Sequence, residues 1–178
     1  MPLPDFVTRL RAGVGHELLW LAGVSAVVVA DDGRLLLGRR SDTGRWAVVS
    51  GILDPGEQPA VAAAREVLEE TGVSVEVVAL TAVESGDLVR YPNGDLAQYL
   101  DVCFWARPAA GSAQAYVADD ESLEVGWFAP DALPADLTSS SIGRIERTMR
   151  YIREVSGDGA RGLDATSHRG VQPWFVRP

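Results

Sequence analysis

Apolar residues recur along the chain first as short strand-like runs, and this pattern predicts a β-rich N-terminal half. Residues 24–30 form a run rich in valine, and residues 34–40 carry three consecutive leucines. An Asp-Asp-Gly turn at residues 31–33 separates the two runs, an arrangement typical of a β-hairpin. A shorter apolar run at residues 17–21 predicts one more strand before them.

Further strand-like runs follow in the second half of the chain. They occupy residues 46–49, 73–85, 98–106 and 125–128. A Pro-Asn-Gly-Asp turn at residues 92–95 separates the two longest of these runs. The pattern therefore predicts strands on both sides of that turn and a short strand near residue 128.

Three segments have the spacing of helices. Residues 4–15 and 141–155 carry apolar residues at every third or fourth position, as amphipathic helices do. Residues 59–71 also read as a helix, with Pro59 suited to its first position and Gly72 to its end. Because strands precede, separate and follow the two later helices, the chain is predicted to form a mixed α+β or α/β sandwich.

The predicted helix at residues 59–71 has two contrasting sides. At about 100° per residue, one side carries an apolar stripe made of Val61, Ala64 and Leu68. The opposite side carries the carboxylates of Glu66, Glu69 and Glu70, and Glu57 in the preceding turn can add a fourth. Clustered carboxylates repel one another. They form either a solvated acidic face or a site for a hard divalent cation such as Mg²⁺ or Mn²⁺.

Composition narrows the function classes. The chain has 178 residues, which suits one domain with appended terminal elements. Its net charge of −9 argues against broad nucleic-acid binding but leaves room for a small phosphate-bearing substrate. The chain has one cysteine, no signal-peptide pattern and no apolar run long enough to span a membrane. We therefore expect a cytoplasmic enzyme without disulfides and without a membrane partner.

One segment resembles a known family at every specified position. The Nudix box reads G-x5-E-x7-R-E-U-x-E-E-x-G-U, where U is aliphatic, and its nine specified residues are Gly51, Glu57, Arg65, Glu66, Val67, Glu69, Glu70, Gly72 and Val73. The resemblance implies an α/β/α sandwich with a mixed sheet over residues 23–155. It leaves an N-terminal helix and short strand at residues 1–22 and a flexible tail at residues 156–178.

The resemblance also implies a chemistry and a set of roles. Nudix (MutT-like) enzymes are pyrophosphatases that hydrolyse a nucleoside diphosphate linked to a further group, X, with Mg²⁺ or Mn²⁺ as cofactor. By position, Glu69 and Glu70 are metal ligands, and Glu66 is a ligand or the general base. Glu57 belongs to the outer or second metal shell, and Arg65 pairs with a box carboxylate and holds its geometry.

Residues outside the box complete the predicted site. Many family members use a carboxylate from a later loop as base or ligand, and here Glu121 or Glu124 is the candidate, unless this is an ordinary acidic loop. Arg39 and Arg40 can hold the substrate phosphate. Because neighbouring residues of a strand face opposite ways, one of these arginines is expected to be a plain surface residue.

One position departs from the family pattern. The chain has Ser50 where the family usually has glycine, although its backbone carbonyl can still serve as a metal ligand. Trp46 and Tyr91 are candidates to stack on the substrate base, or they belong to the core or its rim. These signals leave the substrate open among a nucleoside triphosphate, an ADP-ribose-like molecule and a dinucleoside polyphosphate.

Two further hypotheses remain at the level of sequence. The chain could be a catalytically silent module that senses or binds nucleotides on the same fold. Residues 6–21 precede the family's core and their apolar side chains need a partner surface, so a homodimer is predicted. Trp174 and Phe175 near the end of the chain can anchor the tail on this subunit or another.

Overall fold

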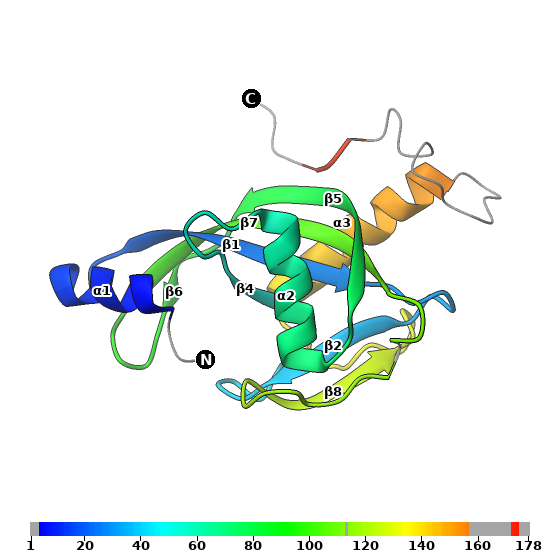
Figure 1. Ribbon diagram of the computed structural model, residues 1–178, viewed down its shortest axis with the longest axis horizontal. Helices are drawn as coiled ribbons and strands as arrows, with labels where there is room; N and C mark the ends of the chain where they lie inside the picture. The colour runs from blue at the N-terminus through cyan, green and yellow to red at the C-terminus, as the bar shows by residue number, and fades with distance from the viewer. Residues whose placement is uncertain (1–3, 113, 157–171, 175–178) are drawn as a thin grey trace.

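The computed structural model describes residues 4–112, 114–156 and 172–174. Within these residues the chain forms three helices and eight strands (Figure 1). The helices are α1 (Asp5–Val14), α2 (Pro59–Thr71) and α3 (Ser139–Ser156). The strands are β1 (Leu19–Val28), β2 (Leu35–Arg40), β3 (Trp46–Ala47), β4 (Val49–Ile52), β5 (Val75–Ser85), β6 (Val89–Arg90), β7 (Leu96–Pro108) and β8 (Ser122–Phe128).

The strands divide into two sheets. The larger sheet has the order β4-β1-β7-β5, with β6 paired to β7, and the smaller has the order β3-β2-β8. The pairing of β1 with β7 is parallel, whereas β4, β5 and β6 join the larger sheet in antiparallel fashion. The sheet is therefore mixed, as predicted.

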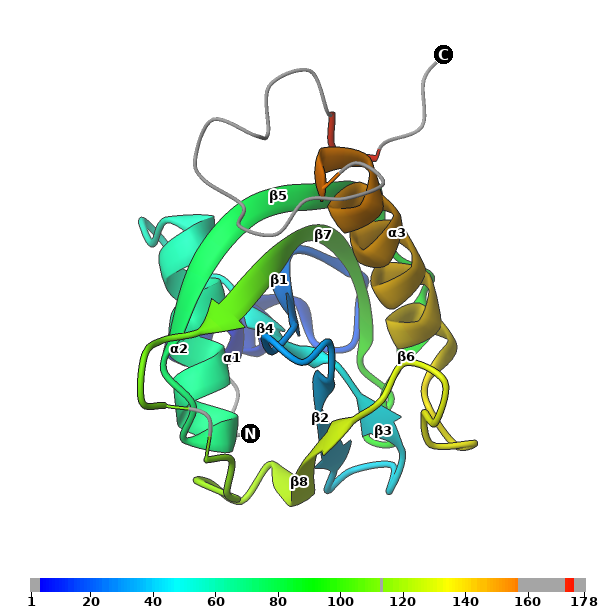
Figure 2. The same cartoon turned by 90° about the vertical axis from the view of Figure 1, so that its right-hand side faces the viewer.

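Helices cover both faces of the larger sheet. Viewed along the sheet, α2 lies on one side and α3 on the other, with the smaller sheet at one edge (Figure 2). On the α2 side, Val67 packs in one apolar cluster with Val24 and Phe104, and on the α3 side Ile145 packs in another with Val27. This arrangement confirms the predicted α/β/α sandwich.

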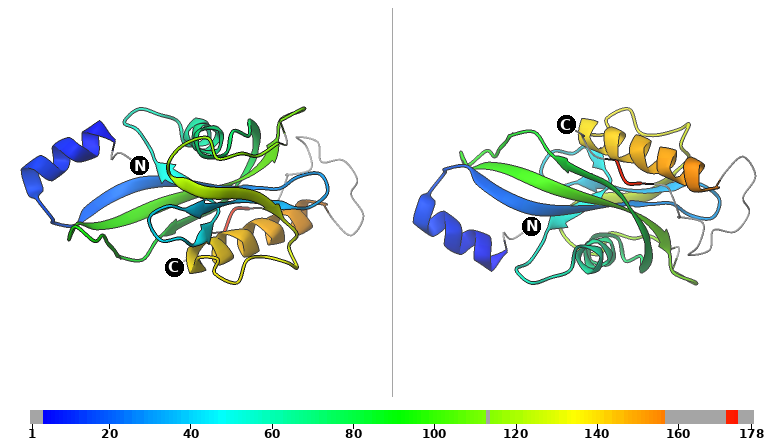
Figure 3. Two further views of the ribbon diagram at one scale, coloured as in Figure 1. Left: turned by 90° about the horizontal axis from the view of Figure 1, so that it is seen from below. Right: turned by 90° about the horizontal axis from the view of Figure 1, so that it is seen from above.

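The three predicted helices are all present. The helix at residues 59–71 has the predicted ends, and α1 and α3 differ from residues 4–15 and 141–155 by only a few residues. Among the described residues, no helix is both long enough and apolar enough to cross a membrane. Helix α1 lies at the far end of the molecule, beside the start of β1 (Figure 3).

The predicted hairpin is wrong. The turn after residue 30 does reverse the chain, but β1 then pairs with β4 and β7, while β2 pairs with β3 and β8. A single bridge between Val29 and Leu35 joins the two runs. Residues 24–29 of the first run and 35–38 of the second are all buried, and such consecutive buried residues need cover on two faces. Two sheets supply that cover better than one two-stranded ribbon.

Two of the predicted strands are parts of one. The runs at residues 17–21 and 24–30 belong to the continuous strand β1, since Gly23 is paired on both sides with Asp101 and Ile52. A glycine in the middle of a strand reads as a break in the sequence pattern. Here it is accommodated inside the ladder.

Trp174 docks on its own chain. Its backbone N–H donates to the carbonyl of Thr81 at 2.8 Å, and its carbonyl accepts from the N–H of Val83 at 3.1 Å, so it extends the open edge of β5. The Arg147 guanidinium lies 4.3 Å from the centre of its ring. Phe175 and most of the predicted flexible tail lie outside the described residues.

Candidate functional site

Helix α2 holds the predicted box carboxylates, and its two ends are set by the residues that the sequence indicated. Pro59 occupies the first helical turn, and Gly72 adopts a left-handed conformation with φ of 68° after the last. The Gly72 N–H donates to the carbonyl of Leu68 at 2.9 Å. A glycine here is required because few other residues adopt this φ without strain.

The face of α2 that packs on the sheet is not the predicted one. Val61 and Leu68 are 60% and 47% exposed, so the predicted apolar stripe faces solvent. The buried side chains of the helix are Ala62, Ala63, Glu66, Val67 and Thr71. Small alanines let the helix approach the sheet closely, and this approach carries a glutamate into the buried face.

The buried glutamate explains the first glycine of the box. Glu66 is 3% exposed, and its carboxylate lies directly over Gly51 of β4. A Cβ atom at residue 51 would collide with that carboxylate. Gly51 has no positive φ, so the requirement here is for space and not for backbone freedom.

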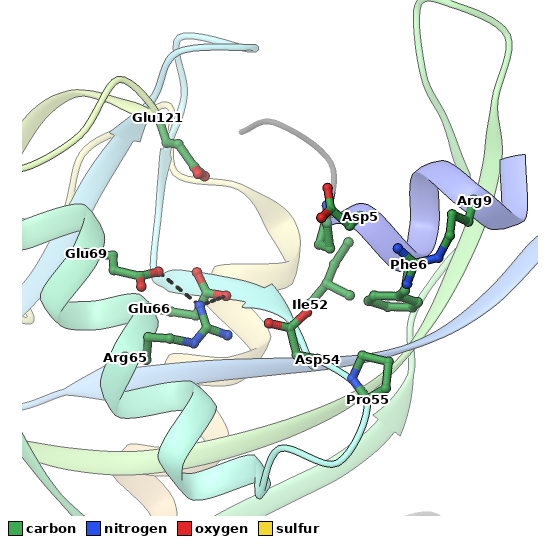
Figure 4. Close-up of a pocket in the computed structure, with 11 residues that line it drawn as sticks. Asp5, Phe6, Arg9, Ile52, Asp54, Pro55, Arg65, Glu66, Glu69 and Glu121 are labelled. Carbon is green, nitrogen blue, oxygen red and sulfur yellow. Dashed lines mark hydrogen bonds and ion pairs between the residues drawn. The ribbon is translucent and has the colours of Figure 1, made fainter. Parts of the chain in front are cut away.

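Arg65 joins three of the box carboxylates. Its Nε and Nη2 donate to the two oxygens of Glu57, both at 2.9 Å. Its Nη1 donates to Glu66 at 3.0 Å and to Glu69 at 2.9 Å (Figure 4). The bidentate contact holds the pKa of Glu57 below its ordinary value. Arg65 therefore fixes the loop before α2 to the helix itself.

In a second group of carboxylates, burial and mutual repulsion outweigh the effect of nearby cations. Burial raises the pKa of Glu70 to about 8, and repulsion from Glu121 and Glu66 adds to it. Burial likewise raises the pKa of Glu66 to about 7, against the opposing effect of Arg65. The pKa of Glu121 is also raised, first by burial. Three carboxylates from α2 and the loop before β8 thus share one region of low dielectric.

The donor chemistry of this group fits a hard divalent cation. Carboxylate oxygens are the ligands that Mg²⁺ and Mn²⁺ prefer, and a nearby cation offsets the burial and the repulsion that raise these pKa values. In the described part of the chain, no three acidic, histidine or cysteine side chains already surround one point closely enough to hold a metal. The residues that could hold it are Glu66, Glu69 and Glu70 of α2, and Glu121 lies near them as a base or a further ligand.

A cleft of about 620 Å³ opens beside these carboxylates. Arg65, Glu66 and Glu69 line one side of it, and Glu121 lies above them (Figure 4). Helix α1 forms the opposite side with Phe6 and Arg9. The cleft has the size of a small-molecule site and combines acidic groups with one aromatic ring.

The sequence profile of the NUDIX domain matches residues 20–148, which is more than half of the chain. The chain belongs to the Nudix family. A "MutT-like protein" of Streptomyces ambofaciens is 40% identical over 108 residues, covering 61% of this chain and 63% of that protein. The mouse "8-oxo-dGDP phosphatase NUDT18" is 32% identical over 143 residues, covering 78% of this chain and 40% of that protein.

The solved structures agree with this assignment. A MutT Nudix hydrolase from Burkholderia pseudomallei superposes with a TM-score of 0.61 at 29% identity, over 72% of this chain and 98% of that one. The chain spans between two fifths and two thirds of the length of the two relatives above. Its Nudix domain is thus the part that these proteins share.

The structure separates the two later carboxylates around the Nudix box. Glu121 lines the cleft and interacts electrostatically with Glu66 and Glu70. Glu124 instead accepts a 2.8 Å hydrogen bond from Arg39 on the neighbouring strand β2 and is exposed. Glu121 is therefore the carboxylate that geometry brings to the box.

The two candidate phosphate ligands also diverge. Arg39 is occupied by Glu124 and by the carbonyl of Gly44. Arg40 donates to both oxygens of Asp42, at 2.9 and 2.7 Å. The charge of Arg40 is nevertheless close enough to Glu70 to oppose its raised pKa. Arg40 is thus the arginine on the side of the Nudix carboxylates.

The candidate stacking residues do not line the cleft. Trp46 packs edge-on against Phe128, with ring centres 4.8 Å apart, at the border of the core. The Tyr91 hydroxyl hydrogen-bonds to that of Tyr99 at 2.8 Å. Aromatic side chains suit a core and a base-binding site equally well, so their type alone could not separate these roles.

Ser50 fits into β4 without strain. It is half-buried and pairs with Ser25 of β1, and no residue other than glycine has a positive φ in the described chain. The backbone at this position therefore does not require the glycine that the family usually has. Its role as a carbonyl ligand stays a prediction.

Sequence reasoning missed the α1 side of the cleft. Phe6 and Arg9 precede the Nudix match, and nothing in their local pattern separates them from an ordinary amphipathic helix. The available signal was the i, i+3 spacing of an aromatic and a cationic residue, which places both on neighbouring parts of one helix face. That signal is weak without the tertiary position of α1.

Proposed function

We propose that this protein is a metal-dependent pyrophosphohydrolase that cleaves the diphosphate of a nucleoside diphosphate linked to a further group, X. The observation that carries the proposal is the convergence of Glu66, Glu70 and Glu121 beside the cleft, within a complete Nudix box. Burying mutually repelling carboxylates is unfavourable for folding alone, so their convergence points to function.

The residues would divide the chemistry between them. Glu66, Glu69 and Glu70 would hold Mg²⁺ or Mn²⁺, with Glu57 in an outer position. The bound cation would acidify a water molecule and neutralise charge on the diphosphate. Glu121 would accept the proton of the attacking water, because it faces the box from the opposite loop. Arg65 positions Glu57 and Glu69 through its hydrogen bonds.

The relatives favour nucleoside di- and triphosphates as the substrate class. The mouse relative is named for 8-oxo-dGDP, a purine nucleoside diphosphate. A nucleoside diphosphate also suits a cleft of about 620 Å³, which lies in the ordinary range for small-molecule sites. We therefore place nucleoside di- and triphosphates before ADP-ribose-like and dinucleoside polyphosphate substrates.

A steady-state assay tests this function. Purified protein with Mg²⁺ or Mn²⁺ is offered nucleoside di- and triphosphates, ADP-ribose, dinucleoside polyphosphates and a 5′-triphosphorylated RNA. We expect release of phosphate or pyrophosphate from the nucleoside di- and triphosphates, a loss of activity with EDTA, and a fall in kcat of about 10²–10⁴-fold in Glu69→Gln. Glu124→Gln is the matched control and should keep its activity, because Glu124 pairs with Arg39 away from the cleft.

The silent-module hypothesis predicts a different result. In that case the wild type would bind nucleotides, measured by calorimetry, yet hydrolyse none of the panel with either metal. That outcome would overturn the proposed activity while leaving the fold assignment intact.

We also propose that the protein is a homodimer. Val7 and Leu21 of the N-terminal segment pack within their own chain, but Leu10, Val14 and Trp20 stay at least 44% exposed. Exposed large apolar residues close together in the sequence support an interface. Light scattering that gave the mass of one chain would contradict this.

A further inference from the structure

Helix α1 forms one wall of the cleft although it lies outside the Nudix match. The match begins at residue 20, and α1 ends at Val14. In the close-up view, Phe6 and Arg9 lie together on the α1 side, and Glu66, Glu69 and Arg65 lie on the other (Figure 4). Ile52 and Asp54 lie between them. One side of the cleft is therefore formed by the Nudix box and the other by a helix that lies outside the Nudix match.

The position of α1 is firmly held. Val7 is 2% exposed and packs with Leu21, Ile52 and Ala97. The Arg11 guanidinium donates to three backbone carbonyls, one of them that of Leu96 in β7 at 2.7 Å. Apolar burial and hydrogen bonding thus fix both the place and the rotation of α1. Its cleft-facing side is defined before any ligand binds.

That side presents a ring and a free cation. At about 100° per residue, Asp5, Phe6 and Arg9 fall within one arc of the helix, next to the buried arc of Val7 and Arg11. Arg9 is exposed and makes no hydrogen bond or ion pair with any described residue. The other arginine of the cleft, Arg65, is occupied by box carboxylates. Arg9 is therefore the cation that a ligand can recruit.

We propose that α1 binds the base of the nucleotide substrate, with Phe6 as its stacking platform and Arg9 as donor to its acceptor edge. The proposal rests on the proposed function, since the diphosphate must lie at the carboxylates of α2. The rest of the nucleotide then extends across the cleft to α1. An aromatic ring offers a stacking surface for any base.

The donor set of Arg9 selects among bases. Arginine carries only donors, in a planar fork that matches the paired O6 and N7 acceptors of guanine. Adenine presents an amino donor beside its N7, so it offers this fork one acceptor. The α1 wall therefore predicts a preference for guanine-type over adenine nucleotides. Phe6 contributes to binding of both.

Kinetics with matched variants test whether Phe6 and Arg9 of α1 bind the base. GDP, GTP, ADP and ATP are compared in the wild type, Arg9→Ala, Arg9→Lys and Phe6→Leu, with Arg153→Ala on α3 as the control. We expect Arg9→Ala to raise KM for guanine nucleotides about tenfold, with kcat changed less than about twofold and adenine nucleotides little affected. Arg9→Lys should recover only part of the loss, because it lacks the fork. Phe6→Leu keeps an apolar side chain and should raise KM for all four.

Two outcomes would overturn the inference. A rise in KM that is equal for guanine and adenine nucleotides in Arg9→Ala would place Arg9 on the phosphates. A fall in kcat at unchanged KM would place it in the chemistry.

Failure of the proposed function would look different. If the wild type hydrolyses nothing, calorimetric titration with GDP and ADP in Mg²⁺ still reads the base preference. Tighter binding of GDP that is abolished in Arg9→Ala would support the α1 wall alone, and equal binding of both nucleotides would overturn it.

Discussion

Two helices face each other across the cleft, and they bring their side chains there by different means. On α2, the spacing of the box places each carboxylate, and Arg65 and Gly51 fix their geometry from within the same motif. On α1, the spacing is that of an ordinary amphipathic helix, and its place is set by Val7 and Arg11 through contacts with distant strands. The Nudix motif therefore indicates how a bond is cut, whereas the side chains that we propose to bind the base are placed by packing.

The largest effect is expected at Gly51, on the α2 side of the comparison. In Gly51→Ala the new Cβ occupies the space of the Glu66 carboxylate, which has to leave its buried position. We expect kcat to fall about 100-fold or more, because a displaced ligand or base disturbs the chemistry itself. The KM of the remaining activity should change little. Retained kcat with a well-folded protein would show that Glu66 is free to move without loss.

The next effect concerns pH and the stability of the metal-free protein. Glu66 and Glu70 have pKa values of about 7 and 8 in the folded chain, above the ordinary glutamate value of about 4.3. Between these limits the folded protein binds more protons than the unfolded one, so stability is full at low pH and is lost as the pH rises. We expect Tm measured in EDTA to fall by several degrees from pH 5 to pH 9.

Two controls test the origin of this pH effect: the addition of Mg²⁺ and the replacement of a glutamate by the neutral isostere glutamine. Mg²⁺ should flatten the dependence, because it stabilises the ionised carboxylates. Glu70→Gln should flatten part of it in EDTA, since its amide does not titrate. A Tm that rises from pH 5 to pH 9 in EDTA would contradict the burial of these carboxylates in the metal-free state.

The packing of α1 can be weakened without substituting any residue of the Nudix box. Val7→Ala removes two buried methyl groups from the contact of α1 with Leu21 and Ile52. We expect a loss of about 1–2 kcal/mol in the free energy of unfolding and a KM that rises with kcat nearly unchanged. Denaturant unfolding and steady-state kinetics measure the two. A fall in kcat as large as the rise in KM would show that the α1 and α2 sides of the cleft are not independent.

The same contrast explains what sequence could and could not predict. The ends of α2 follow from Pro59 and Gly72, which are local signals. The buried face of α2 did not follow, because periodicity assumes that glutamates face solvent, whereas Glu66 lies in the buried face of the helix. The hydrophobic pattern therefore mispredicted the buried face of α2 at the residues that are predicted to carry the chemistry.

Strand pairing failed for a related reason. The Asp-Asp-Gly turn correctly predicted a chain reversal, but the partner of β1 is β7, a parallel neighbour from far along the chain. Parallel pairs leave no turn signature between adjacent runs, so periodicity cannot identify them. The position of α1 depends on this pairing, because Ala97 and Leu96 of β7 form part of its support. Local sequence patterns could thus not predict that α1 lines the cleft.

The smallest effect is expected at Gly13 of α1, where the substitution by alanine can be compared with that at Gly51. Gly13 lies in the last turn of α1, and a Cβ built on it meets no atom within 4 Å. Glycine in a helix interior is less favourable than alanine by about 0.5–1 kcal/mol, so Gly13→Ala should stabilise the protein by up to that amount without changing kcat or KM. Urea unfolding and the same kinetic assay measure this.

If Gly13→Ala instead raised KM as Val7→Ala is expected to, the exposed side of α1 would take part in binding, and the binding surface would extend beyond Phe6 and Arg9. If stability rises and kinetics stay unchanged, the contrast holds, because the same substitution is harmful only where a glycine makes room for the Glu66 carboxylate.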